Sequence, residues 1–184
     1  MNLPAKKPLP RQRPSAPVLE LVRPGVTFDP AQVLTCQPER FADIARELPP
    51  LFQQHWQELG SNRDAIPLDP DWDRYFALEG AGSLRVMTAR AGDMLAGYIF
   101  NIVGPHLHYR STLHSEIEMF WLDPIYRGTW FSVRWARANE AMLDELGVKR
   151  RLVGIKKGYM DGRVAVIFKR LGYKIVEELY GLDS

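Results

Sequence analysis

The residues best suited to chemistry lie in one stretch, from Glu116 to Ser132. Glu116 and Glu118 stand two positions apart in an apolar run, so a strand points both carboxylates to one face. Two carboxylates on one face of a central strand are costly to bury unless they are used or paired. The turn residues from Asp123 to Thr129 then precede a helical pattern. A helix start leaves N–H groups unpaired and carries partial positive charge, which suits a phosphate or pyrophosphate.

Three consecutive elements must position these groups: a strand at 116–122, a helix at about 130–146 and a strand at 151–156. The helix has one apolar face and is followed by Gly147, a stop signal. This order of elements requires a right-handed crossover between parallel strands. We therefore expect the two strands to be adjacent and parallel, with the helix crossing between them.

The remaining patterns add an antiparallel hairpin and several helices. The hairpin strands are expected at 84–89 and 94–103, joined through a tight turn at Gly92-Asp93. Further elements are a helix opened by Pro38 and interrupted at Pro49-Pro50, a short helix after Asp69-Pro70, a helix at 162–170 and a final strand at 173–180. Together they predict a mixed sheet with helices on both faces, in the α/β or α+β class.

Composition indicates one globular domain at 25–184 and a distinct arm at 1–24. Hydrophobic residues make up 46% of the 184 positions, charged residues 25%, and the net charge of +2 does not by itself indicate nucleic acid. The arm is basic and rich in proline, so we expect it to lie extended across a protein partner or a second copy. Packing of the arm on its own domain is the alternative.

No apolar run approaches the about 18 residues of a membrane span, and no signal-peptide region is visible.

The stretch from Leu122 to Thr129, Leu-Asp-Pro-x-Tyr-Arg-Gly-x, resembles the loop between the fourth strand and third helix of GCN5-related N-acetyltransferases. The stretch from Phe168 to Tyr173 resembles the late helix of that family and its exit. The resemblance spans roughly residues 83 to 180 and is nearest to the acetyltransferase-like proteins of tailed phages. It implies a mostly antiparallel central sheet with splayed parallel strands and helices on both faces.

The resemblance also implies acetyl-coenzyme A as co-substrate, an amine as acceptor and a location in the cytoplasm, or in the host cell or virion for a phage protein. The residues that it assigns to the cofactor are Leu122, Arg127, Gly128, Thr129, Trp130, Phe131 and Ser132. Two of them depart from the family pattern, because Trp130 stands where the first motif glycine belongs and Ser132 where glycine or alanine belongs. Glycine there lets the backbone approach the ligand closely, which a tryptophan does not repeat.

The implied catalytic groups are a base and an acid. Glu118 matches the position of the base better than Glu116, and a structural role is the alternative for both. The usual acid is a tyrosine at the position of Phe168, which has no proton to give; Tyr159 is near enough in sequence to replace it. These departures favour a second interpretation: a catalytically degenerate structural or adaptor protein, docked in a phage particle through its arm.

Two more groups of residues are candidates for binding. His106 and His108 would point to one side of an extended segment and form a polar rim to an acceptor pocket; a surface loop or an incomplete metal site are the alternatives. Basic residues between 149 and 174 could hold the phosphates of coenzyme A or face an acidic partner, or could be a solvated face. These are Lys149, Arg150, Arg151, Lys156, Lys157, Arg163, Lys169, Arg170 and Lys174. Nucleic acid is disfavoured because no aromatic residues are interleaved among them.

Overall fold

A computed structural model describes residues 33–60, 62–156 and 159–182. Its centre is a five-stranded sheet in which the strands follow one another in chain order. All neighbours are antiparallel except β4 and β5, which are parallel. The strands are β1 (Leu34–Glu39), β2 (Leu84–Ala91), β3 (Met94–His106), β4 (Tyr109–Leu122) and β5 (Arg150–Val153). The predicted mixed, mostly antiparallel sheet is confirmed.

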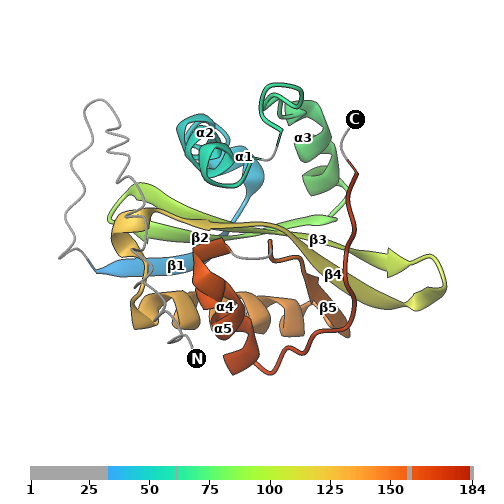
Figure 1. Cartoon of the computed structure of the whole chain (residues 1–184). Coiled ribbons are helices and arrows are strands. Elements are labelled where there is room, and N and C mark those ends of the chain that lie inside the picture. The colour runs from blue at the N-terminus through green and yellow to red at the C-terminus, as the bar shows by residue number, and fades with distance from the viewer. Residues whose placement is uncertain (1–32, 61, 157–158, 183–184) are drawn as a thin grey trace, which may run out of the picture.

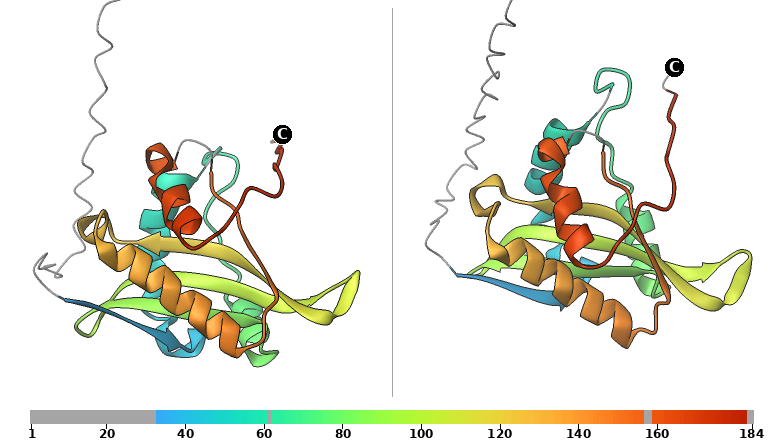
Figure 2. Two further views of the ribbon diagram at one scale, coloured as in Figure 1. Left: turned by 90° about the horizontal axis from the view of Figure 1, so that it is seen from below. Right: turned by 60° about the horizontal axis from the view of Figure 1, so that its bottom comes forward.

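Helices cover both faces of the sheet, as predicted (Figure 1). One face carries α1 (Phe41–Ile44), α2 (Leu48–Leu59) and α3 (Trp72–Gly80); the other carries α4 (Trp130–Glu145) and α5 (Arg163–Arg170). Figure 2 shows α4, which joins β4 to β5 in the chain, running along its face across β1 and β2, with α5 beside it. The two short 3-10 turns are η1 (Pro124–Tyr126) and η2 (Tyr159–Gly162). The helix at 130–145 is therefore the predicted crossover.

The two faces of the sheet bury different cores. Under α1 to α3 the core is aromatic, with Phe41, Phe100 and Trp121 almost fully buried. Rings pack on rings there: Phe52 stacks on Trp72 at 5.6 Å between centroids. Under α4 and α5 the core is mostly aliphatic around buried Trp135 and Phe168. A cavity forms on the face of the sheet that carries the aromatic core.

A bulge in β4 shapes the centre of the sheet. The register with β3 shifts between Phe100 and Asn101, which leaves Glu118 as the extra residue of β4. On the other side, β4 pairs with β5 only from His114 to Ile117, although β4 continues to Leu122. Pairing stops there because β5 ends at Val153, before the predicted end at Lys156, so the splay of the parallel strands stays a prediction. We call the side of β4 beyond Ile117 the opening between β4 and β5.

Two predicted elements were wrong. Pro38 does not open a helix but lies within β1, where it stands opposite Met87. It is tolerated because β1 is an edge strand and needs no hydrogen bond from that position on its outer side. The helical pattern begins afterwards, at Phe41, and Pro49 and Pro50 open α2, because proline fits the first turn of a helix.

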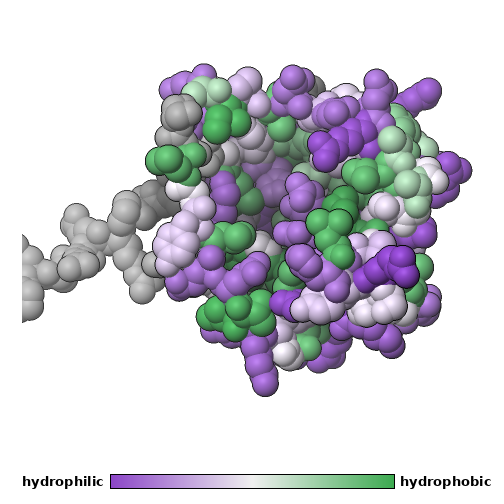
Figure 3. Space-filling view, turned by 90° about the vertical axis from the view of Figure 1, so that its right-hand side faces the viewer, coloured by the Kyte–Doolittle hydropathy of each residue, from purple (hydrophilic) through white to green (hydrophobic). Residues whose placement is uncertain are grey.

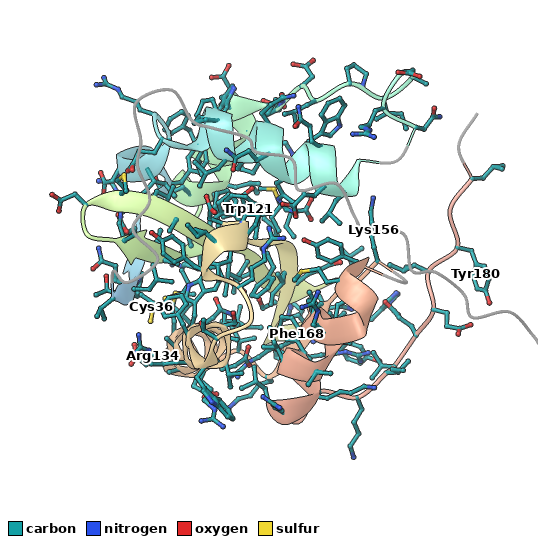
Figure 4. The ribbon with its side chains drawn as sticks, turned by 60° about the vertical axis from the view of Figure 1, so that its left-hand side comes forward. Cys36, Trp121, Arg134, Lys156, Phe168 and Tyr180 are labelled. Atoms are coloured by element: carbon teal, nitrogen blue, oxygen red, sulfur yellow. The ribbon has the colours of Figure 1, made fainter. Side chains whose placement is uncertain are left out.

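The segment 173–180 was predicted as a strand, but it pairs with no strand among the described residues. The chain leaves α5 and runs along the side of the molecule, where Tyr180 points outward (Figure 4). Ile175, Leu179 and Tyr180 are more than four-fifths exposed, on a face that mixes hydrophobic and hydrophilic side chains (Figure 3). The sequence favours an extended backbone, but a strand also needs a partner edge, which this path does not reach.

The arm predicted at 1–24 lies outside the described residues, as do Lys157 and the first residues of the predicted domain. Within the part that the structure describes, no helix combines the length and apolar character needed to cross a membrane.

Candidate active site

The turn between β4 and α4 positions the predicted anion site. Asp123 accepts a hydrogen bond from the N–H of Ile125 at 3.1 Å, which starts η1. Gly128 has a φ of +78°, a left-handed conformation that favours glycine. Thr129 is the N-cap of α4 and accepts a 3.3 Å hydrogen bond from the N–H of Phe131. The strand, turn and helix thus follow one another as the sequence predicts, with the start of α4 at the end of β4.

The side chains around this helix start divide into buried and exposed ones. Phe131 and Ser132 are buried in the first turn of α4. Trp130 is 76% exposed, and the guanidinium of Arg170 from α5 lies 5.2 Å from the centre of its indole. The indole therefore does not fill the turn. It forms an outer contact between α4 and α5, worth about 0.5–1 kcal/mol at an exposed site.

Arg127 turns away from the helix start and towards the end of β4. Its Nε donates a 2.6 Å hydrogen bond to the carbonyl oxygen of Leu122. One Nη pairs with Glu58 of α2 at 2.9 Å, and the guanidinium lies 5.7 Å from the ring centre of Trp121. Arg127 and Leu122, both predicted to bind the cofactor, are thus joined to each other, and Arg127 ties the turn to α2.

Tyr159 meets the same carboxylate from the opposite side. Its hydroxyl donates a 2.9 Å hydrogen bond to Glu58, so Glu58 bridges Arg127 and Tyr159. Burial, together with the negative charge of Glu58, raises the pKa of Tyr159 to about 12, although Arg127 opposes the shift. Tyr159 therefore keeps its proton at neutral pH, which a general acid requires.

Glu116 and Glu118 lie on the face of the sheet that carries α1 to α3. Glu116 stands opposite Ile102, which packs against the aromatic core. Both glutamates are exposed. The energetic cost of burying two carboxylates on one strand face, which their spacing suggested, therefore does not arise. Glu118 sits in the bulge and adds to the raised pKa of Tyr75, whose main cause is burial. Glu118 is therefore the carboxylate nearer to the cavity.

A cavity of 380 Å³ opens on this face, between α2, the segment 60–70, α3 and the middle strands. Its walls are mainly rings and aliphatic groups, among them Phe52, Trp56, Tyr75 and Tyr98. We call it the aromatic cavity. Lys156, which follows β5, reaches its edge and donates a hydrogen bond to the carbonyl of Leu59 at the end of α2 (Figure 4).

His55 lines the aromatic cavity with its imidazole held in place. Its Nδ1 lies 2.9 Å from the hydroxyl of Tyr98. Burial lowers the pKa of His55 to about 4, and Arg127 and Lys156 lower it further against the opposing charge of Glu58. The imidazole is consequently neutral at physiological pH. His55 is thus a neutral, hydrogen-bonded histidine that faces a cavity.

The other predicted residues lie away from this site. His106 ends β3 at the tip of the β3–β4 hairpin and stacks on His114 at 5.0 Å between centroids. Neither His106 nor His108 is among the described residues that line the aromatic cavity. Groups of metal-ligating side chains are absent from the described part of the chain. Phe168 is 3% exposed and packs against Phe120 and Tyr173, so it serves the core.

Three of the basic residues between 149 and 174 make contacts on different elements. Arg151 pairs with Glu140 and Asp144 of α4. Lys156 points to α2, and Arg170 covers Trp130. Each of these cations has a local structural contact. Of the interpretations that the sequence left open, a shared phosphate site for the whole group is the least compatible with this distribution.

Sequence reasoning missed Glu58, which joins Arg127 to Tyr159. Its only local signal is the spacing from His55, three positions earlier on the same helix. That spacing places both side chains on one face of α2. Their partners lie on β3, η1 and η2, far away in the sequence, so no motif could have revealed the cluster.

Comparison of the whole chain with family models and with curated proteins gives no match. Comparison with solved structures gives acetyltransferases. A ribosomal-protein-alanine N-acetyltransferase from Brucella melitensis biovar Abortus 2308 is 14% identical, with a TM-score of 0.61 over 83% of this chain and 99% of the other. A glucosamine-6-phosphate N-acetyltransferase from Arabidopsis thaliana is 11% identical, with a TM-score of 0.60 over 83% and 99%. A predicted acetyltransferase from Clostridium acetobutylicum, solved with acetyl-CoA, is 13% identical, with a TM-score of 0.59 over 82% and 96%.

The chain therefore has the fold of GCN5-related N-acetyltransferases over most of its length. At these low sequence identities the similarity shows the fold alone and does not establish an activity for this chain.

Proposed function

We propose that this protein is an acyl-coenzyme A-dependent N-acetyltransferase that moves an acetyl group from acetyl-coenzyme A to an amine. The observation that carries the proposal is the meeting of three features at Glu58. Arg127 precedes the start of α4 and is bonded to the carbonyl of Leu122 at the end of β4. Its partner Glu58, which also binds Tyr159, belongs to α2, the helix whose His55 and Leu59 line the aromatic cavity. A thioester placed in the opening would face an amine placed in the cavity.

Coenzyme A fits the opening for two reasons. The N–H groups at the start of α4, from Gly128 to Ser132, suit its pyrophosphate. Beyond Ile117, β4 pairs with no strand of the described residues on the β5 side, so an extended pantetheine arm could run along it. The buried indole N–H of Trp121 has no hydrogen-bond partner in the described part of the chain and offers a donor next to this opening. Arg127 would release the carbonyl of Leu122 as the arm enters.

The chemistry then requires two proton transfers. The lone pair of the neutral amine attacks the thioester carbonyl carbon, a C–N bond forms and the C–S bond breaks. The nitrogen loses one proton, which we assign to Glu118 on the cavity side. The thiolate gains one proton, which we assign to Tyr159, because its hydroxyl is protonated at neutral pH and is held by Glu58 beside Arg127.

Titration calorimetry with coenzyme A, followed by thiol release from acetyl-coenzyme A with a panel of amines, tests the proposal. Tyr159→Phe should lower kcat by about 10²-fold or more, the usual contribution of a general acid. Tyr180→Phe is the matched control, because Tyr180 is 90% exposed on the C-terminal segment. Wild-type protein that binds no coenzyme A would refute the proposed function.

A specific observation favours a second candidate, the catalytically degenerate adaptor. Arg127 lies beside the opening and is bonded both to Glu58 and to the carbonyl of Leu122. Both contacts would be expected of a residue with a purely structural role. For this candidate, a protein partner or phage particle would bind the arm at 1–24. Deleting residues 1–24 should then abolish co-sedimentation with the particle and leave the domain folded. Normal assembly of the truncated protein would exclude the adaptor role.

A further inference from the structure

We propose that the acceptor is a primary amine carried on an aromatic, otherwise apolar body, which binds in the aromatic cavity. This inference rests on the proposed acetyl transfer and names the acceptor class for the same site. It comes from the composition of the cavity walls, the contacts that their polar groups already make, and the distribution of charge around them.

The walls favour a flat apolar ligand. Phe52, Trp56, Tyr75 and Tyr98 line the cavity together with Met119 and Leu59. Apolar area that leaves water for such walls gains about 25 cal/mol per Å². An aromatic ring gains a further 0.5–1.5 kcal/mol, roughly, where it stacks or meets a ring edge-on. The volume of 380 Å³ lies in the range of small-molecule pockets.

The polar groups of the walls are few, and two of the ionisable ones are already in use. Apart from the tyrosines, the ionisable side chains among the described residues that line the cavity are His55, Asp69 and Lys156. His55 is bonded to Tyr98, and Lys156 donates to the carbonyl of Leu59. A sugar or polyamine would lose its water here without gaining equivalent hydrogen bonds, which is unfavourable.

The charges suit a ligand with a single ammonium group. Asp69, itself exposed, lines the cavity from the segment that precedes α3, and Glu118 acts on Tyr75 from the β4 side. These two carboxylates attract a cation, and the faces of the surrounding rings do the same. Lys156 opposes them, but its ammonium is directed to the carbonyl of Leu59. One amine on an apolar body therefore meets both the walls and the charges.

The experiment compares phenethylamine, glucosamine and spermidine as acceptors, with thiol release from acetyl-coenzyme A as readout. We expect kcat/KM for phenethylamine to exceed that for the other two by about 100-fold, equivalent to roughly 2.8 kcal/mol of binding. Titration calorimetry of phenethylamine with the full chain, without coenzyme A, gives a second readout that is independent of turnover.

Two variants test the cavity itself. Ile66→Lys places a charge on a cavity residue that is 52% exposed, so folding should tolerate it. It should raise the KM for phenethylamine about tenfold or more, because a cation would face the incoming ammonium. Leu107→Lys is the matched control at the hairpin tip, where the side chain is 97% exposed, and should leave KM unchanged.

The outcomes separate the inference from the proposed function. Coenzyme A binding with efficient use of glucosamine or spermidine, but not phenethylamine, would overturn the acceptor class and leave the acetyltransferase standing. Phenethylamine binding that is weakened by Ile66→Lys, without any coenzyme A binding, would support the cavity assignment and refute acetyl transfer. Equal effects of Ile66→Lys and Leu107→Lys would overturn the cavity assignment.

Discussion

The turn at 123–132 and the aromatic cavity are built from the chain in opposite ways. The turn is one continuous segment whose own side chains cap and shape it, as Asp123 and Thr129 do. The cavity takes its walls from α2, α3, β3, β4 and the segments that follow α2 and β5. A continuous site can form once its neighbours fold locally, whereas a composite site exists only when the whole sheet and its helices are assembled.

Glu58 and Trp121 stand where the two regions meet. Glu58 holds Arg127 of the turn from α2, and Trp121 lies between the ring of Tyr98 and the guanidinium of Arg127. The effect of a mutation should therefore depend on the region in which it lies. Changes at the junction should affect both regions, changes in the turn should remain local, and exposed positions nearby should matter little.

The largest effect is expected at Trp121, which is 1% exposed. Trp121→Ala should lower the free energy of unfolding by about 3–5 kcal/mol, because it leaves a large void between the cavity and the turn. Urea unfolding followed by circular dichroism measures this. Trp130→Ala is the matched control: Trp130 is 76% exposed, so the loss should stay within about 1 kcal/mol. Equal losses would show that the junction has no special role.

The next effect concerns pH and the cavity. The folded-state pKa of His55 is about 4, below the unfolded value, so its neutral form is favoured by folding. This contribution is complete above pH 6.5 and is lost as the pH falls from 6.5 towards 4, by at most about 3 kcal/mol. His55→Gln should flatten this part of the stability profile relative to wild type. Parallel profiles for the two proteins would contradict the burial of a neutral imidazole.

A local effect is expected in the turn. Gly128→Ala should lower the free energy of unfolding by about 1–2 kcal/mol, because alanine is strained at a φ of +78°. The control is Gly80→Ala in α3, where an added Cβ meets nothing within 4 Å and helix propensity should stabilise by about 0.5–1 kcal/mol. Gly128→Ala should also weaken the binding of coenzyme A, measured by calorimetry, while the binding of phenethylamine stays constant. A loss of both would break the distinction between the two regions.

The smallest effect on stability is expected at Glu58. Glu58→Gln keeps the shape and removes a charge that is about a quarter exposed, so the loss should be within about 1 kcal/mol. Its signature should be electrostatic: the pKa of Tyr159 should fall, because Glu58 contributes to raising it. Spectroscopic titration of the tyrosines, with Tyr159→Phe to assign the signal, measures this. An unchanged titration would show that the two side chains are not coupled.

Local patterns in the sequence were sufficient for the elements around the turn. The β4 apolar run, the turn residues and the 3.6-residue periodicity of α4 act over a few positions, so they predict strand, turn and helix directly. The crossover rule then gives the parallel pairing of β4 with β5. The family resemblance, and not these local patterns, proposed Glu118 and Tyr159 as catalytic residues, and their roles remain predictions.

Tertiary structure decided what local patterns cannot express. The sequence shows that 173–180 favours an extended chain, but whether a strand forms depends on a partner edge, and the path after α5 leaves that segment exposed. Arg127 carries the charge expected of an anion ligand, yet Glu58, brought from α2, determines where that charge points. The aromatic cavity likewise appears only when distant rings meet. Pairing and packing join residues far apart in the chain, so their outcome depends on the assembled fold.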